Sequence, residues 1–171
     1  MYNVNDVIFY SSTGVCRVKA VGKPDIKGMP DGVDYYTLQP ISETHREMIY
    51  VPVTTKAFMR PTMSSRQAYE YIDYVKSLSP VYPSSRNPKA IADFYTDLIG
   101  SYKSENLLQV IVSLTVKKRD SQAAGKQLNQ TQTGFLRQAQ EMILGEFSLV
   151  LDMPRERVWQ MIDENISKRA D

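Results

Sequence analysis

The sequence predicts an α+β protein with two parts, and two observations carry this prediction. Residues 1–63 hold short runs of alternating apolar residues separated by turn-forming residues, whereas beyond Thr62 apolar residues recur at spacings of three and four. The composition, 42% hydrophobic and 23% charged over 171 residues, is that of globular domains. We therefore expect a small SH3-like β-barrel domain at residues 1–63 and a bundle of about five helices at residues 64–171.

Four β-rich runs define the first part. They are Val7–Tyr10, Val15–Val21, Tyr35–Pro40 and Met48–Val53. The stretch between the second and third runs, GKPDIKGMPDGVD, is rich in glycine, proline and aspartate, which is typical of a surface loop or an extended hairpin. Four or five strands in about sixty residues indicate a strongly bent sheet or a barrel.

Capping residues and apolar spacing predict the helices of the second part. A proline- and serine-rich break, SLSPVYPSSRNPKA, separates the first helix from the second. The expected starts and stops are Ser64 or Ser65 for the first helix, Asn87-Pro88 and Gly100 for the second, Ser104 for the third, Asn129 for the fourth and Pro154 for the fifth.

No group of residues predicts an enzyme. Cys16 and His45 are the only cysteine and histidine, and they could form a nucleophile–base pair only if folding happened to bring them together. The same two residues cannot form a usual zinc site, and no phosphate-binding loop is present. We expect no metal or cofactor, and Cys16 as a small buried residue. A single cysteine fits a cytoplasmic protein, and no apolar run is long enough for a membrane span.

The densest run of basic residues is Lys117-Lys118-Arg119, where we expect a helix to end. One interpretation is a helix end with solvated cations. The other is phosphate contact, supported by the polar side chains of GKQLNQTQTG. The net charge of +2 makes any affinity for DNA modest. The predicted DNA-binding residues are Arg86, Lys89, Lys117, Lys118, Arg119 and Lys126.

The order of these parts resembles the CarD/CdnL family of bacterial transcription regulators over essentially the whole chain. The opening VNDVIFYSSTGVCRV resembles the family pattern VGDxVVYPxHGVGxV, and IKG at 26–28, YYTLQP at 35–40 and MIYVPV at 48–53 follow its strands. In the helical part, LLQVIVSL resembles VAEVVRDL, FLRQAQEMILGEFSLVLDM resembles MLxxARxxLxxELALAL, and VWQMIDENI resembles AxxLIDExL. The order and spacing of these motifs carry the resemblance.

The resemblance implies a role in transcription. In this family a Tudor-like N-terminal domain pairs an exposed strand edge with the β1-lobe of the RNA polymerase β subunit. The helical domain rests on promoter DNA at the upstream edge of the transcription bubble and stabilises the open complex. The polymerase-binding residues that the resemblance implies here are Arg46, Met48, Ile49, Tyr50 and Val51. In an alternative arrangement this strand is paired on both sides and Tyr50 is half-buried in the core. An alternative function is that of an adaptor that binds polymerase or another protein without contacting DNA.

The chain departs from the family pattern at several points. Ser11 and Thr13 stand where the pattern has proline and histidine, and Tyr50 stands where many members have arginine. QLNQTQTGFL replaces GLSxGEKRML, which removes a basic pair before a helix. Family members often have a tryptophan wedge at a position that falls near residues 89–91, and none is present there. We expect Trp159 to pack in the apolar face of the last helix instead.

Overall fold

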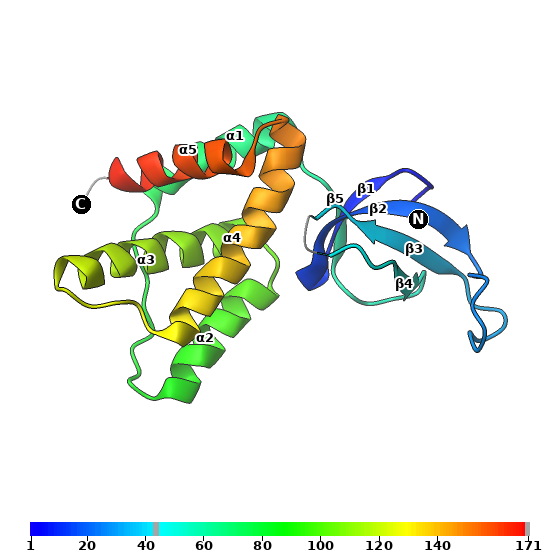
Figure 1. Ribbon diagram of the computed structural model, residues 1–171, viewed down its shortest axis with the longest axis horizontal. Helices are drawn as coiled ribbons and strands as arrows, with labels where there is room; N and C mark the ends of the chain where they lie inside the picture. The colour runs from blue at the N-terminus through cyan, green and yellow to red at the C-terminus, as the bar shows by residue number, and fades with distance from the viewer. Residues whose placement is uncertain (43–44, 170–171) are drawn as a thin grey trace. The chain divides into compact units, whose positions relative to one another are not determined.

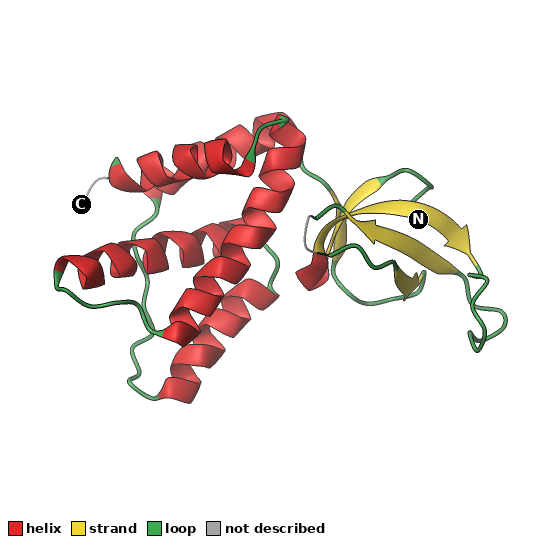
Figure 2. Ribbon diagram, viewed as in Figure 1, coloured by secondary structure: helices red, strands yellow, loops and turns green. Residues whose placement is uncertain are grey.

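The chain is an α+β protein in which a sheet is followed by helices (Figures 1 and 2). The computed structural model describes residues 1–42 and 45–169, and these contain five β-strands and five α-helices. Contacts within the chain define two compact units, Met1–Thr62 and Met63–Asp171. The first unit contains the strands and the second contains the α-helices, which confirms the predicted fold class and number of helices.

The first unit is a five-stranded antiparallel sheet. Its spatial order is β4-β3-β2-β1-β5, so β4 and β5 are the edges. Within the described residues the two edges do not pair with each other, and the sheet is therefore open. A closed barrel is not confirmed. The strands are β1 (Val7–Tyr10), β2 (Gly14–Gly22), β3 (Tyr35–Pro40), β4 (Ile49–Pro52) and β5 (Met59–Pro61).

A β-bulge and a shared core curl this sheet. The pairing of β2 with β3 shifts register between Val18 and Ala20, and such a bulge bends a strand and increases its twist. Ile49 from one edge strand and Met59 from the other both pack against the same core cluster. Its buried members are Ile8, Cys16, Val18, Tyr36, Leu38 and Val51.

Two details of the strands differ from the sequence-based prediction. Met48 and Val53 lie just outside β4, and β5 was not among the predicted runs. A run of three residues that ends in Pro61 is too short to show an alternating pattern, so only its pairing with β1 reveals it as a strand. The stretch ISETHREM at residues 41–48, between the last two predicted strands, includes residues 43 and 44, which lie outside the described residues.

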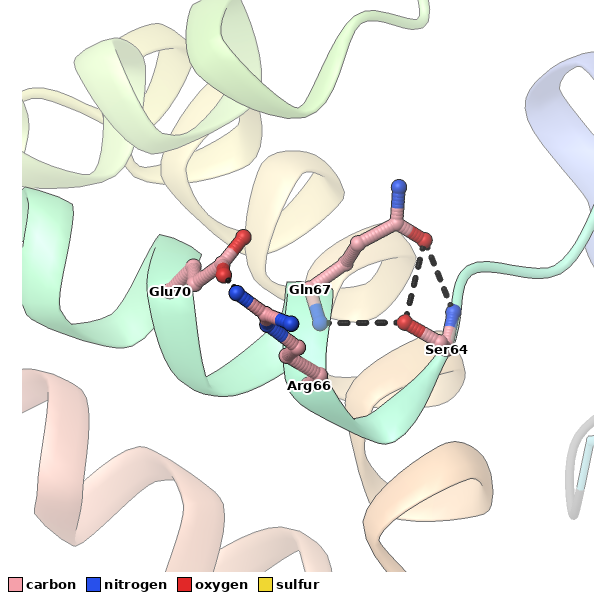
Figure 3. Close-up of polar contacts among 4 residues, drawn as sticks. All are labelled: Ser64, Arg66, Gln67 and Glu70. Carbon is pink, nitrogen blue, oxygen red and sulfur yellow. Dashed lines mark hydrogen bonds and ion pairs between the residues drawn. The ribbon is translucent and has the colours of Figure 1, made fainter.

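Local capping explains where most helices begin. The Ser64 hydroxyl accepts a hydrogen bond from the Gln67 N–H at 3.1 Å, and the Gln67 side chain accepts one from the Ser64 N–H at 2.9 Å (Figure 3). An Arg66–Glu70 ion pair spans the next turn. Asn129 caps a later helix. The helices are α1 (Ser65–Tyr74), α2 (Pro88–Gly100), α3 (Ser104–Ala123), α4 (Gln130–Leu151) and α5 (Arg155–Ser167).

One predicted cap is wrong. Lys103, not Ser104, is the N-cap of α3, and it makes no side-chain cap. Lys103 has the extended backbone that a cap position needs, with φ −79° and ψ 132°. Ser104 is the first helical residue and is buried. Asn87 caps α2 as predicted, with its side chain accepting from the Lys89 and Ala90 N–H groups.

The core of the second unit is built around α3. This helix packs against α2 and α4, and α4 also contacts α1 and α5 (Figure 1). A helix that is apolar on most of its surface belongs in an interior. Its buried apolar residues are Leu107, Leu108, Val110, Ile111, Val112 and Leu114.

Two side chains of α4 and α5 depart from a simple apolar face. Glu146 on α4 is only 1% exposed, and its carboxylate accepts a hydrogen bond from the Met63 N–H at 3.0 Å. This bond fixes the chain just before α1. Trp159 is half-buried beside the buried Val158 and Ile162, so it lies at the margin of the α5 apolar face and not in its centre.

Candidate functional site

The β4 strand is an open edge of the sheet. Val51 lies opposite Tyr36 of β3, and the Val53 N–H donates to the Asp34 carbonyl oxygen at 3.0 Å. Backbone groups alternate in direction along an antiparallel strand, so the Val51 N–H also faces β3. The same alternation directs the N–H and C=O of Tyr50 away from the sheet. Tyr50 therefore presents a donor and an acceptor at the open edge.

This pairing site ends at Pro52. Pro52 has no N–H, and its carbonyl accepts a hydrogen bond from the Thr55 N–H at 2.9 Å. In the part of the chain that the structure describes, no hydrogen bond engages the backbone of Tyr50 on its outward side. A strand added to β4 would therefore gain two backbone hydrogen bonds at Tyr50 and could extend only toward residues 45–48.

The predicted polymerase-binding side chains differ in exposure. Arg46 and Met48 are exposed, and Ile49 and Tyr50 are half-buried. Val51 is 3% exposed and belongs to the core cluster, on which Ile49 also packs. Arg46, Met48 and Tyr50 are therefore the side chains of this set that remain accessible to a partner.

The opposite edge, β5, is less suited to strand addition. It has three residues and ends at Pro61, whose carbonyl accepts a hydrogen bond from the Arg60 guanidinium at 3.1 Å. The same guanidinium lies 4.6 Å from the centroid of the Phe9 ring. Short length, a proline and a positively charged side chain are features that protect sheet edges from pairing. Of the two edges, β4 is the better docking strand.

An open depression of about 530 Å³ lies where β4 begins. Its walls come from the 3-10 turn between β1 and β2, the end of β3, and the segment that leads into β4. The lining residues are Ser12, Thr13, Pro40, His45, Arg46, Glu47 and Ile49. Ile49 is both a wall residue and the first residue of the open edge. The depression and the pairing site are therefore continuous.

The cysteine is part of the core and not of this depression. Cys16 is 0% exposed, and burial raises the pKa of its thiol to about 12. The thiol is therefore protonated at neutral pH, and its Sγ donates weakly to the Gly14 carbonyl at 3.7 Å. His45 is exposed and lines the depression together with Ser12 and Thr13.

The three consecutive basic residues do not form one surface. The α3 helix continues to Ala123, so Lys117–Arg119 lie inside it and not at its end as expected. Successive side chains on a helix diverge by about 100°. Arg119 donates to the Asp163 carboxylate at 2.6 Å and to the Ser167 hydroxyl at 3.1 Å, which joins α3 to α5. Lys118 is exposed.

Lys117 meets an aromatic residue that the sequence did not single out. Its ammonium lies 5.8 Å from the centroid of the Tyr82 ring. The Tyr82 hydroxyl donates to the Ser113 carbonyl at 3.0 Å, and the Val81 N–H donates to the Ser113 hydroxyl at 2.9 Å. Burial, with the nearby Asp120 carboxylate, raises the pKa of Tyr82. The proline-rich break is therefore fixed along α3.

The remaining predicted DNA-binding residues are exposed at separate places. Arg86 precedes the cap of α2, Lys89 lies in its first turn, and Lys126 lies in the connection that follows α3. The structure brings Lys117 to the 78–87 segment that leads to Arg86, and it holds Arg119 against α5. The second unit thus has dispersed cations.

Among residues 1–42 and 45–169, no three His, Cys, Asp or Glu side chains are grouped so as to hold a metal ion. Over the same residues, the helices are too short or too polar to cross a membrane.

No family model fits the chain, and a search of curated proteins found no similar sequence. The function proposed below therefore depends on the sequence motifs and on the geometry of the β4 edge.

Proposed function

We propose that the chain is a cytoplasmic bacterial transcription regulator that docks on the β1-lobe of the RNA polymerase β subunit. The observation that carries this proposal is the outward-facing backbone of Tyr50 on the open β4 edge. Strand addition to such an edge is a common way to bind a protein partner. The motifs that resemble the CarD/CdnL family, in which this edge docks on polymerase, run through these same strands.

The shape of the first unit supports a Tudor-like module. A bulge curls the sheet, and both edge strands pack on one small core although they do not pair. This arrangement supports a barrel-like module that leaves one edge accessible.

Backbone pairing alone is too weak to hold the complex. Two hydrogen bonds contribute about 1–3 kcal/mol in total, whereas micromolar binding needs about 8 kcal/mol. The accessible side chains of Met48, Tyr50 and Arg46 must supply much of the remainder. Side chains around the edge therefore determine which strand binds.

The helical unit provides the second half of the proposed function. Its exposed cations, Lys118, Lys126, Lys89 and Arg86, are suited to phosphate contacts that carry little base specificity. Polymerase docking would hold these residues near promoter DNA at high effective concentration, so weak contacts suffice. We expect the bound protein to change the lifetime of the promoter open complex.

The full chain with Tyr50→Pro tests the docking edge, because this variant removes the outward N–H. Tyr50→Val is the matched control, since it changes the side chain and keeps the donor. Titration with purified β1-lobe should show a loss of about tenfold or more for the proline variant, beyond any effect of valine. Equal binding by all three proteins would contradict docking through β4.

A second candidate function is an adaptor that binds polymerase without touching DNA. This function is favoured by the contacts that Arg119 and Lys117 make within the chain, with Asp163 and Tyr82 respectively. The open-complex lifetime separates the two functions. A regulator changes this lifetime in a manner that requires Tyr50 N–H, whereas an adaptor binds the lobe and leaves the lifetime unchanged.

A further inference from the structure

The depression at the start of β4 has no role in strand pairing itself. It lies beside the only edge position with a free backbone donor and acceptor in the described part of β4, and Ile49 belongs to both. Because Pro52 closes the other end, a docking strand has to run past residues 45–48 and hence past this depression. The residues that line the depression are therefore part of the same interface.

The walls of the depression offer an occupant hydrogen-bond donors and one positively charged side chain. Ser12 and Thr13 supply two hydroxyl donors, and Arg46 supplies an exposed guanidinium. No ion pair to Arg46 occurs in the described portion of the chain. Glu47 is the single acidic wall residue that the structure describes, and it is placed to repel an acid.

We propose that the depression receives an acidic side chain, aspartate or glutamate, of the strand that docks on β4. The carboxylate pairs with the Arg46 guanidinium and accepts hydrogen bonds from the Ser12 and Thr13 hydroxyls, while Ile49 contacts the stem of the side chain. Glu47 opposes this charge and limits the affinity. The inference rests on the proposed function, since it names the chemistry of the partner strand.

Opposite charge changes at two neighbouring residues test the sign of the charge that the occupant carries. In the full chain titrated with the polymerase β1-lobe, Arg46→Glu should weaken binding by about tenfold or more, whereas Glu47→Gln should strengthen it by about twofold to fivefold. Lys19→Glu is the matched control. It makes the same charge change as Arg46→Glu, but at an exposed position of the interior strand β2 that lies outside the depression. It should alter binding by less than about twofold.

Charge exchange on the lobe identifies the partner residue. Each aspartate and glutamate of the lobe's docking strand is changed to lysine, and one such variant should bind poorly to the natural chain and regain affinity for Arg46→Glu. The inference is wrong if Arg46→Glu binds like the natural chain, or if Glu47→Gln weakens binding while Arg46→Glu strengthens it. In either case, loss of binding by Tyr50→Pro would leave docking through β4 intact, whereas normal binding by Tyr50→Pro would overturn the docking itself.

Discussion

Proline placed at two consecutive positions of β4 should have very different effects on stability. At Val51 it removes an N–H that faces β3 and leaves the carbonyl of Tyr36, a residue only 4% exposed, without its donor. An unsatisfied buried carbonyl costs about 1–3 kcal/mol, and the displacement of a fully packed side chain adds to this. We expect Val51→Pro to lower the free energy of unfolding by about 2–4 kcal/mol. At Tyr50 the replaced N–H faces outward, so only the half-buried ring is lost, at about 1 kcal/mol or less.

Urea unfolding of the full chain, followed by near-ultraviolet circular dichroism of the tyrosines, measures both values. The first unit contains Tyr2, Tyr10, Tyr35, Tyr36 and Tyr50, so its unfolding contributes to this signal. The reasoning requires Val51→Pro to be the less stable variant by about 1–2 kcal/mol or more. If Tyr50→Pro unfolds at the same or a lower urea concentration than Val51→Pro, the Tyr50 N–H does not face outward and the reasoning is wrong.

Three other outcomes follow from the structure. The pKa of Cys16 is about 12 in the folded protein and 9.0 in the unfolded chain, so the free energy of unfolding should fall as the pH rises from 9.0 toward about 12. Urea titrations over this pH range should show a smaller fall for Cys16→Ala. Trp159→Ala should cost about 1–3 kcal/mol, less than for a fully buried ring, and DNA should leave the fluorescence of Trp159 nearly unchanged; strong quenching would place this ring on the DNA. Lys118→Glu should weaken the binding of any DNA sequence and reduce the salt dependence of this binding, and a salt slope equal to that of the natural chain would exclude phosphate contact at Lys118. Arg119→Ala should mainly lower the free energy of unfolding, by about 1 kcal/mol or less, because the ion pair of Arg119 with α5 is partly exposed.

The sequence predicts those parts of the fold that local interactions determine. Ser64, Asn87 and Asn129 begin helices because their side chains bond to N–H groups two or three residues away, and such spacings are visible in the chain. The third helix shows the limit of this rule. Its start depends on the backbone of Lys103, and Ser104, a buried residue, is the first helical residue and not the cap.

Features that depend on contacts distant in sequence were not predictable. The three residues of β5 form a strand only because β1 pairs with them, and whether the sheet closes depends on how far the bulge at Lys19 curls it. Arg119 could be taken for a DNA contact because its partner, Asp163, lies 44 residues away. The direction of the Tyr50 backbone likewise required the pairing register of β4, which a short edge strand does not reveal.

Amide hydrogen exchange of Tyr50 tests the docking edge most directly. Its N–H has no partner among the described residues of the free protein, so exchange should be fast, whereas the N–H of Val51, which faces β3, should be protected. Addition of RNA polymerase core enzyme should slow the exchange of Tyr50 by about tenfold or more, because the N–H then pairs with the docking strand. Protection of Tyr50 in the free protein, or unchanged fast exchange of Tyr50 in a saturated polymerase complex, would contradict strand addition at β4.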